Sequence, residues 1–442
     1  MSAAQGAEIK GKKAMKVLII SHNPITTYQS MGKTLLSLFH SFDKSELCQL
    51  YCYPTVPDVS ACNSYYRVTD RDILKSFFHF GKINLRTVSE KDIKLAPRSI
   101  YESDDVARLY KKHRKNAFTL LMRDAMWFFS RWYNAELEEW LTKEKPDCIF
   151  LAPGESTFIY RIALRISKRL GIDIYTYICD EYYFVSKPQG YIEQIQLHFL
   201  KKKMKEVITQ SKAVVTICDE LATAYKEEFG VKTHTILTGA NVSIAEKPQV
   251  IDQRRSITYM GNLSCNRFES IAEIGRALDD LNLERGTDYK LNIYSQPLRE
   301  DVRTLFSPIK SINYLGYVTG DEFECVLRQA EVLLHVEAFD LKSIERVKHS
   351  ISTKIADSLG SGVLLLAYGP EKIASVQHLI RNQCAVVITA REDLKDGLFR
   401  LFRKTTLEDT IENALLTARK YHMSEKNSEA LYRILKGLVD DR

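Results

Sequence analysis

The chain has 442 residues, of which 45% are hydrophobic and 27% are charged, which is typical of a globular protein and excludes collagen-like repeats, coiled coils and extensive disorder. Its 63 basic and 56 acidic side chains leave a net charge of +7. This surplus excludes a dedicated nucleic-acid-binding protein but favours anionic ligands or an anionic lipid surface. At about 100–200 residues per domain, the length predicts two or three domains.

The nine cysteines are scattered, with no Cys-x-x-Cys pair and no histidine at zinc spacing. We therefore predict no metal site and a reducing, cytoplasmic environment. No stretch approaches the roughly 18–20 apolar residues that span a bilayer. The polar lead at residues 1–14 is not followed by an apolar segment of signal-peptide length, so we expect a protein that is neither exported nor integral to a membrane.

Short apolar runs rich in β-branched residues alternate with amphipathic segments along the first half. Residues 15–20 form the first run, and apolar residues at helical spacing predict a helix from about Gly32. Strands alternating with helices predict a parallel sheet that is covered on both faces. The same order returns with runs at 148–151, 172–178 and 214–217, and with helices that end near Leu170 and begin at Asp219.

A second series of strands and helices follows a polar segment at 240–256, which contains Pro248 and which we interpret as a linker. The last forty or so residues are predicted to be helical. The predicted fold class is therefore α/β, with two Rossmann-like doubly wound domains. The strands of the second domain are predicted at 257–260, 291–294, 312–315, 332–336, 363–367 and 385–388.

A less regular region lies at about 60–145. Its aromatic residues around Trp127 and its basic residues are typical of an interfacial helix on anionic lipid, or of a core helix with a solvated basic flank. The basic stretches near 111–115 and 201–205 have two interpretations: they face lipid, or they are simply solvated. Asp70-Arg-Asp72 has the form of an Asp-x-Asp metal–nucleotide motif, but it follows no predicted strand, and we interpret it as surface charge.

The loops after the strands are the candidate sites, because ligands of open α/β sheets bind at the carboxyl ends of the strands. After 257–260, Gly261 allows close approach of the backbone, and Arg267 offers a forked donor that suits phosphate oxygens. After 312–315, the exposed backbone at Tyr317 and Val318 is placed to read the edge of a base.

A helix that ends near Gly360 carries a second candidate site. Ser352 or Thr353 is expected to cap its first turn, where unpaired N–H groups and the charge of Lys354 would together hold a diphosphate. Asp357 follows one turn later, where a carboxylate can accept hydrogen bonds from sugar hydroxyls.

Several segments of both halves resemble the GT-B-fold, family-4-type glycosyltransferases of bacterial capsule, exopolysaccharide and lipopolysaccharide assembly. They are MKVLIISHNP and VVTICDELATAYKEEFGVK in the first half, and YMGNL with its following NR, YLGYV, EVLLHVE and STKIADSLGSG in the second. The resemblance covers most of the chain apart from about 55–145. It implies two Rossmann-like domains that face across a cleft and a final helix that crosses back to the first domain. The implied division is a flexible lead at 1–14, an acceptor-side domain at 15–245, a nucleotide-sugar-binding domain at 255–420 and the final helix at 421–442.

The resemblance also assigns roles to residues. It implies that Arg267 and Lys354 act in catalysis by stabilising the leaving diphosphate. His349 stands where the first Glu of the family's Glu-x7-Glu motif is expected, so a carboxylate near the donor sugar is absent or is supplied by Glu337. The implied donor nucleotide and diphosphate contacts are Gly261, Asn262, Tyr317, Val318, Ser352, Thr353 and Asp357, with Asp357 on the ribose. Candidates for the donor-sugar or acceptor side, mostly in strand-end loops, are His22, Asn23, Glu155, Asp180, Glu337 and His349, although a packing or capping role suits His22 equally well.

The resemblance implies transfer of a sugar, with retention of configuration, from a UDP- or GDP-linked donor to a hydroxyl of a saccharide. The expected acceptor is a lipid-linked glycan, with a peripheral contact on the cytoplasmic membrane face and no further cofactor, metal or nucleic acid. Two alternatives stay open. A nucleotide-sugar epimerase of the same fold would need a pair of facing carboxylates, and a catalytically silent subunit of a glycan-assembly complex would need none.

Overall fold

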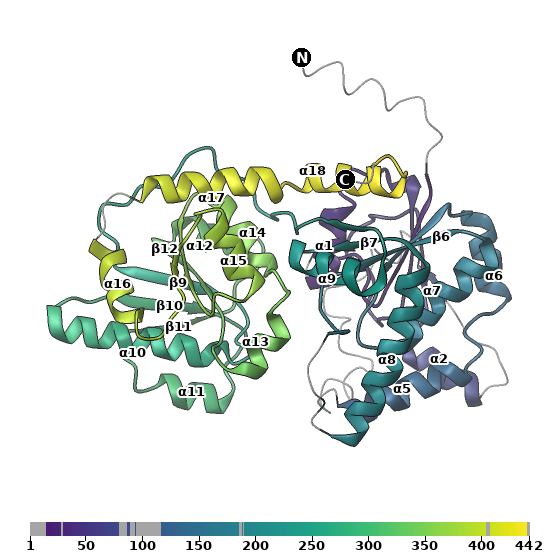
Figure 1. The fold of residues 1–442 in the computed structure, drawn as a ribbon, viewed down its shortest axis with the longest axis horizontal. Helices are drawn as coiled ribbons and strands as arrows, with labels where there is room; N and C mark the ends of the chain where they lie inside the picture. Colours follow the sequence, from purple (N-terminus) through teal and green to yellow (C-terminus); the bar gives the residue numbers. More distant parts are fainter. Residues whose placement is uncertain are drawn as a thin grey trace, which may run out of the picture. The chain divides into compact units, whose positions relative to one another are not determined.

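The structure is a computed structural model that describes residues 15–27, 30–78, 86–88, 93, 116–184, 188, 190–403 and 407–439. The expected lead at 1–14 and the basic stretch at 111–115 lie outside the described residues. Two compact units make up the chain (Figure 1). The N-terminal unit comprises Met1–Thr216, Ala222–His234 and Ser428–Arg442, and the C-terminal unit comprises Ile217–Leu221 and Thr235–Asn427. Among the described helices, none has the length and apolar character needed to cross a bilayer.

The N-terminal unit is built on an eight-stranded sheet in the order β4-β3-β2-β1-β5-β6-β7-β8. β1 pairs in parallel with both β2 and β5, whereas β4 runs antiparallel to β3. The strands are β1 Val17–Ser21, β2 Leu47–Tyr51, β3 Ser64–Arg67, β4 Arg86–Val88, β5 Cys148–Ala152, β6 Asp173–Ile178, β7 Ser211–Thr216 and β8 Thr233–Thr235. The helices up to residue 229 are α1 Ser30–Leu38, the 3₁₀ helix η2 Lys44–Glu46, α2 Asp70–Phe78, α5 Ala117–Phe129, α6 Ala135–Glu144, α7 Thr157–Leu170, α8 Tyr191–Gln210 and α9 Asp219–Phe229.

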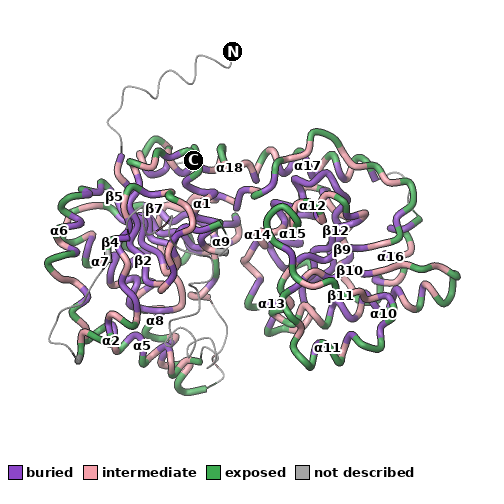
Figure 2. Tube along the Cα trace, turned by 180° about the vertical axis from the view of Figure 1, so that it is seen from behind, coloured by how far each residue is buried: buried purple, intermediate pink, exposed green. Residues whose placement is uncertain are grey.

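The central strands of this sheet are buried on both faces, as expected for parallel strands between helix layers. Every residue of β1, β2 and β5 is buried, and Figure 2 shows β2 and β5 in the buried colour while α6 carries exposed stretches. The last helix, α18 Ser424–Leu435, brings the end of the chain to this unit. There, the Ser428 hydroxyl accepts a hydrogen bond from Ser41 N at 2.9 Å, and Tyr175 donates to Leu435 O at 3.1 Å.

The C-terminal unit contains a six-stranded parallel sheet in the order β11-β10-β9-β12-β13-β14. Helices cover both of its faces, and Figure 1 shows α10 and α17 on opposite sides of the sheet. The strands are β9 Ser256–Met260, β10 Lys290–Tyr294, β11 Ile312–Gly316, β12 Val332–Val336, β13 Leu364–Tyr368 and β14 Val386–Ile388. The helices are α10 Arg267–Arg285, α11 Glu300–Phe306, α12 Asp321–Gln329, α13 Leu341–Val347, α14 Thr353–Gly360, α15 Ala374–Arg381, α16 Leu394–Arg403 and α17 Glu408–Tyr421.

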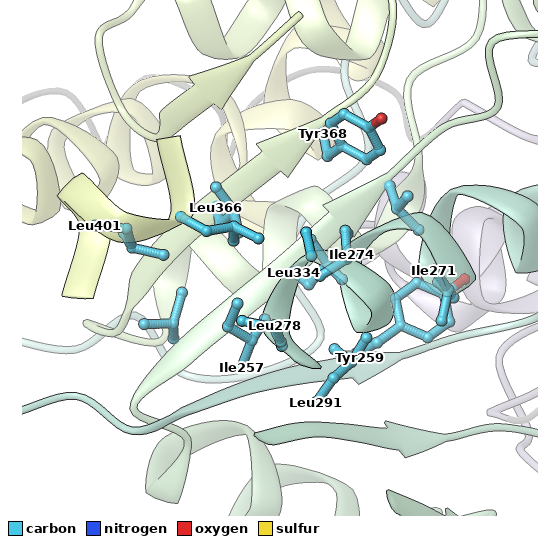
Figure 3. Packing of buried hydrophobic residues seen from close by; sticks show 14 of the residues in the cluster. Ile257, Tyr259, Ile271, Ile274, Leu278, Leu291, Leu334, Leu366, Tyr368 and Leu401 are labelled. Atoms are coloured by element: carbon cyan, nitrogen blue, oxygen red, sulfur yellow. The ribbon is translucent and has the colours of Figure 1, made fainter. Parts of the chain in front are cut away.

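The core of the C-terminal unit forms where α10 packs on the sheet (Figure 3). Ile271, Ile274 and Leu278 lie on one stripe of α10 at helical spacing, and all three are fully buried. They belong to the same cluster as Ile257 of β9 and Leu334 of β12. This packing fixes the start of α10 close to the ends of the two central strands, which matters for the site.

The α/β fold class with two parallel-sheet domains is confirmed. Each strand that the sequence predicts is present within a few residues, and β12 has the predicted bounds. The interpretation of about 60–145 as less regular is wrong where the structure describes it, because β3, α2, α5 and α6 lie there. The helix expected around Trp127 is present as α5. β3 escapes detection because it is only four residues of polar and aromatic side chains, and β2, which also went unpredicted, carries Gln49 at its centre.

Three buried histidines of the C-terminal unit predict a pH-dependent stability. Burial lowers the pKa of His335 to about 4, of His378 to about 3 and of His422 to about 4. His422 is 1% exposed, with Nδ1 2.7 Å from Thr238 O and Nε2 3.3 Å from Nε2 of His378. The unfolded chain takes up these protons near pH 6.5, whereas the folded unit takes them up only near pH 3–4. Stability is therefore full above pH 6.5 and is lost as the pH falls towards 4.

We expect the unfolding free energy of this unit to stay constant from pH 7.5 to about pH 6.5 and to fall from there to pH 5, measured by hydrogen exchange of the β12 and β13 amides. His378→Gln removes one of the three protons, so the slope should decrease by about 1.4 kcal/mol per pH unit. His198→Gln, at an exposed position of α8, is the control and should leave the slope unchanged. An unaltered slope in His378→Gln would contradict the prediction.

Candidate functional site

Each sheet reverses its strand order at one place. From β1 the chain moves outward through β2 and β3 before β5 returns to the other side of β1, and from β9 it moves through β10 and β11 before β12 returns. The loops at the carboxyl ends of the two strands at such a point border a crevice, which is where open α/β sheets bind ligands. The β9/β12 point and the β1/β5 point are therefore the two candidate sites.

At the β9/β12 point, Arg267 and Glu337 form a buried ion pair. Arg267 is the first residue of α10, and its Nε and Nη2 lie 3.0 and 2.9 Å from the two carboxylate oxygens of Glu337, which follows β12 directly. The two side chains are 16% and 2% exposed. Burial by itself would lower the pKa of Arg267, but the charge and hydrogen bonds of Glu337 outweigh it and raise that pKa. Nη1 of Arg267 lies 3.3 Å from Asn262 Oδ1, so the guanidinium is fixed on three sides.

Lys354 lies against the loop after β9. A Cβ atom on Gly261 would lie 2.5 Å from Lys354 Nζ and 2.7 Å from the Tyr259 hydroxyl, so a larger residue here would displace the ammonium group from this position. Ser352 is confirmed as the N-cap residue of α14, which ends at Gly360 as predicted, but its side chain makes no capping hydrogen bond, and Thr353 is already the first helical residue. The structure thus brings Lys354 and the start of α14 to the predicted loop.

His335 of β12 is a site residue that the sequence analysis missed. Its Nε2 is buried, lies 3.6 Å from Glu337 Oε1 and has no hydrogen-bond partner among the described residues. Burial lowers its pKa to about 4, Glu337 opposes this shift, and the charges of Arg267 and Lys354 add to it. All three charged side chains therefore act on one imidazole. An ionisable residue in the otherwise aliphatic run VLLHV was the available signal.

The remaining predicted donor residues lie elsewhere in this unit. Asp357 is 5% exposed, and its Oδ1 accepts a hydrogen bond of 2.6 Å from Asn241 N, so its carboxylate holds the backbone of another segment; its ribose contact stays a prediction. Tyr317 is 58% exposed and Val318 is 8% exposed, on the turn after β11. His349 lies between α13 and α14, where burial lowers its pKa and its carbonyl accepts a bond from Cys218.

The β1/β5 point of the N-terminal unit holds a pocket of about 170 Å³. The pocket brings together all four residues predicted from the strand-end loops of the first domain, which are His22 and Asn23 after β1, Glu155 after β5 and Asp180 after β6. Their assignment to an acceptor stays a prediction. The other lining residues are Met31, Leu120, Arg123, Ala152, Pro153, Gly154, Ser156, Phe158, Ile159 and Tyr182.

Arg123 of α5 is the second site residue that the sequence analysis missed. It is 9% exposed, its Nε lies 2.9 Å from Asp70 Oδ1, its Nη1 lies 3.3 Å from Ser156 Oγ, and its guanidinium lies 4.7 Å above the Phe158 ring. The Trp127 indole stacks on the same Phe158 ring, with 4.1 Å between the ring centroids, and its Nε1 donates a hydrogen bond to Asp70 Oδ1 at 2.7 Å. α5 thus supplies a cation to the pocket, and its Trp127 supports the aromatic side chain of Phe158 of α7, which lines the pocket.

The interpretation of Asp70-Arg-Asp72 as surface charge is therefore wrong for Asp70. The motif begins α2 just after β3, and the Asp70 side chain is only 21% exposed. Asp72 accepts bonds from Thr69 N and Thr69 Oγ1 at 2.9 and 2.7 Å, which caps the helix. Within the described ranges, no group of three or more His, Cys, Asp or Glu residues is placed to hold a metal ion.

Gly32 on α1 is required by a close approach of the loop that borders the pocket. A Cβ at this position would lie 2.3 Å from Thr26 Oγ1, 2.7 Å from Thr26 N and 2.8 Å from Pro24 O. Because two of these atoms are backbone, Gly32→Ala should cost about 1–3 kcal/mol of unfolding free energy through overpacking. Chemical denaturation followed by tryptophan fluorescence measures this. Gly154→Ala, where nothing lies within 4 Å, is the control, and an equal cost in both variants would contradict the prediction.

No protein-family model and no curated protein matches the sequence. Solved structures do share the fold. An α,α-trehalose-phosphate synthase (UDP-forming) from Burkholderia xenovorans in complex with glucose-6-phosphate is 10% identical, with a TM-score of 0.58 over 96% of this chain and 100% of that chain. WaaG, a glycosyltransferase involved in lipopolysaccharide biosynthesis, is 11% identical, with a TM-score of 0.56 over 95% and 100%. The N-terminal domain of trehalose-6-phosphate phosphatase from Candida albicans is 11% identical, with a TM-score of 0.60 over 97% and 98%.

At these identities the likeness shows the fold alone. The predicted GT-B type of the α/β fold is confirmed, since the neighbours include glycosyltransferases of that architecture that match nearly the whole chain.

Proposed function

We propose that the protein is a glycosyltransferase that moves a sugar from a nucleoside-diphosphate-sugar, UDP- or GDP-linked, to a hydroxyl of a saccharide. The observation that carries this is the placement of Lys354 against Gly261, beside the fixed guanidinium of Arg267, at the switch point of the C-terminal sheet. Lys354 and a helix start in such a crevice suit a diphosphate, and Arg267, whose charge Glu337 balances, adds guanidinium donors. The neighbours named as glycosyltransferase and as a UDP-forming synthase support the same reaction class.

Transfer of a glycosyl group requires little covalent participation by the protein. As the bond between the anomeric carbon and the diphosphate oxygen breaks, negative charge develops on the diphosphate, where Lys354 and the first turn of α14 supply positive potential. Glu337 holds Arg267 in place before the reaction, so its guanidinium needs no reorganisation. The acceptor oxygen forms the new bond to the anomeric carbon and passes its proton to the departing phosphate. This route gives retention, as the family-4 resemblance implies, and requires no dedicated base.

A panel of UDP- and GDP-sugars, assayed for release of nucleoside diphosphate in the presence of membranes that contain lipid-linked glycans, tests the proposal. We expect release with one donor, dependent on acceptor, and a product whose anomeric configuration by NMR matches that of the donor. Interconversion of the donor sugar without acceptor would identify an epimerase instead. Tight donor binding without any turnover would identify a silent subunit and overturn the proposal.

We further propose that the protein contacts the membrane, where its glycan acceptor is anchored, through α5 and α8. These helices pack against each other, and Trp127 is fully buried, so α5 is a core helix on that side. Its other side is apolar and exposed, and the exposed lysines Lys202 and Lys205 lie on α8. Exposed aromatic side chains beside lysines favour an anionic bilayer surface. The exposed apolar residues of the two helices are Phe118, Met122, Phe128, Phe129, Tyr191, Ile192 and Phe199.

Sedimentation with vesicles tests this contact. Binding to vesicles with anionic phosphatidylglycerol should exceed binding to neutral phosphatidylcholine, and Phe129→Ser combined with Tyr191→Ser should abolish it. Leu283→Ser, at an exposed apolar position of α10 in the other unit, is the matched control and should bind as the wild type does. Equal sedimentation of the double variant and the wild type would overturn the membrane contact.

A further inference from the structure

His335 is an ionisable side chain inside the C-terminal sheet, one residue before the end of β12. Leu334 and Val336 of this strand belong to the core on the α10 side, and Figure 3 shows Leu334 next to Ile274 of that helix. Because side chains alternate along a strand, His335 lies on the opposite face of the sheet. α17 covers that face and packs against α14, the helix that carries Lys354.

The imidazole of His335 is buried without a hydrogen bond at Nε2. The residue is 8% exposed, and in the part of the chain that the structure describes this nitrogen has no hydrogen-bond partner. Glu337 Oε1 lies 3.6 Å away, which is longer than a hydrogen bond, and both oxygens of that carboxylate already accept from Arg267. A buried polar atom left in this way is uncommon in a folded protein and indicates a functional role.

Charged side chains from three elements act on this imidazole. Glu337 follows β12, Arg267 begins α10, and Lys354 lies in the first turn of α14. Burial, together with the charges of Arg267 and Lys354, lowers the pKa of His335 to about 4, and the charge of Glu337 opposes this shift. The ring is therefore neutral between pH 5 and pH 7 in the protein without ligand. An anion beside Lys354 would offset one of the charges that keep it neutral.

We propose that His335 takes up a proton from solvent when a nucleoside diphosphate binds beside Lys354, and so becomes a further cation that holds this ligand in the crevice. Because the coupling is reciprocal, proton uptake strengthens binding by the same factor as binding favours uptake. Affinity for the nucleoside diphosphate, which is the product of the transfer, therefore rises as the pH falls from 7 to 5, and product release slows. The inference rests on the glycosyltransferase proposed above and adds a regulation of its donor site.

NMR of the full chain, labelled with carbon-13 at histidine Cε1, tests the inference, because this carbon reports whether the ring is charged. His335→Gln identifies the His335 signal by its loss. At pH 5.0 the signal should report a neutral ring without ligand and a charged ring with saturating UDP or GDP. The matched control is His378, which is buried beside His422 in the same unit and is identified with His378→Gln. Its signal should report a neutral ring under both conditions.

Calorimetric titration measures the consequence for affinity. The affinity of the wild type for UDP or GDP, divided by that of His335→Gln, should rise at least about threefold from pH 7.0 to pH 5.0. Division by the variant removes the titration of the terminal phosphate of the ligand itself. If His335→Gln does not fold, Lys354→Ala identifies the His335 signal instead, because removal of that charge should raise the pKa of His335 in the protein without ligand.

The outcomes separate the inference from the proposed function. A His335 ring that stays neutral at pH 5.0 with bound nucleotide would overturn the inference and leave the glycosyltransferase standing, and so would a ring that is already charged without ligand. A ring that becomes charged on binding, in a protein that transfers no sugar from any donor, would refute the proposed function alone. Failure of both UDP and GDP to bind would overturn the two together.

Discussion

Lys354→Ala is expected to lower kcat/KM for nucleotide-sugar-dependent transfer by about 100–1000-fold, the range found when one preorganised group at a developing charge is removed. The ammonium group lies at the Gly261 loop and acts on His335, so it is held in the crevice before any ligand arrives. Rates of nucleoside diphosphate release across donor concentrations measure the effect. Lys354→Arg keeps the charge but not its shape, and should retain part of the activity.

Lys310→Ala is the matched control for this experiment. Lys310 is exposed and precedes β11 at the amino end of the same sheet, away from the carboxyl ends where the crevice lies. Its removal should leave kcat/KM unchanged. A folded Lys354→Ala protein with wild-type kcat/KM would refute the role of this residue, whatever the reaction turns out to be.

Glu337→Gln should lower the unfolding free energy of the C-terminal unit by about 3–5 kcal/mol, because it leaves the Arg267 cation buried without its counter-charge. Glu337 is 1% exposed and accepts two hydrogen bonds from that guanidinium. Its backbone N also donates to Tyr368 O at 2.9 Å, so the residue cannot move easily to relieve the loss. Urea unfolding followed by hydrogen exchange in β12 measures the effect.

The control is an exposed pair of the same chemistry. Arg299 and Asp301 are 64% and 61% exposed, and an exposed ion pair contributes about 0–1 kcal/mol, so Asp301→Asn should be nearly neutral. Replacing both buried partners, Arg267→Met with Glu337→Leu, should recover most of the lost stability but no activity. If Glu337→Gln costs no more than Asp301→Asn, the pair does not carry the energy that its burial implies.

The sequence predicts the aliphatic strands well, since runs such as residues 332–336 leave little choice of structure once they are flanked by helical spacing. Strands of mixed composition escape prediction. In β2, Gln49 donates its side-chain amide to Ser21 Oγ at 2.8 Å and to Asn23 O at 3.2 Å, so a buried polar residue is satisfied by partners that the local sequence does not reveal.

The same dependence on long-range partners separates the site residues that the sequence predicts from those that it misses. Gly261, Arg267 and Lys354 are found from sequence because each stands next to a strand end or a helix start, which is a local signal. Arg123 is not found from the sequence, because its role depends on the ion pair with Asp70. That residue lies 53 residues away in the chain and contacts Arg123 only in the folded unit. Residues whose role comes from a long-range partner need the tertiary structure.

The stacking of Trp127 on Phe158 gives the protein a built-in optical probe. The chain has three tryptophans, Trp127, Trp132 and Trp140, and all of them belong to the N-terminal unit. Intrinsic emission therefore monitors that unit without a label, and the indole that lies behind the Arg123 wall is the one best placed to sense occupancy of the pocket. A Trp132→Phe, Trp140→Phe background would isolate its signal, so that saccharide titrations could be followed in a fluorimeter.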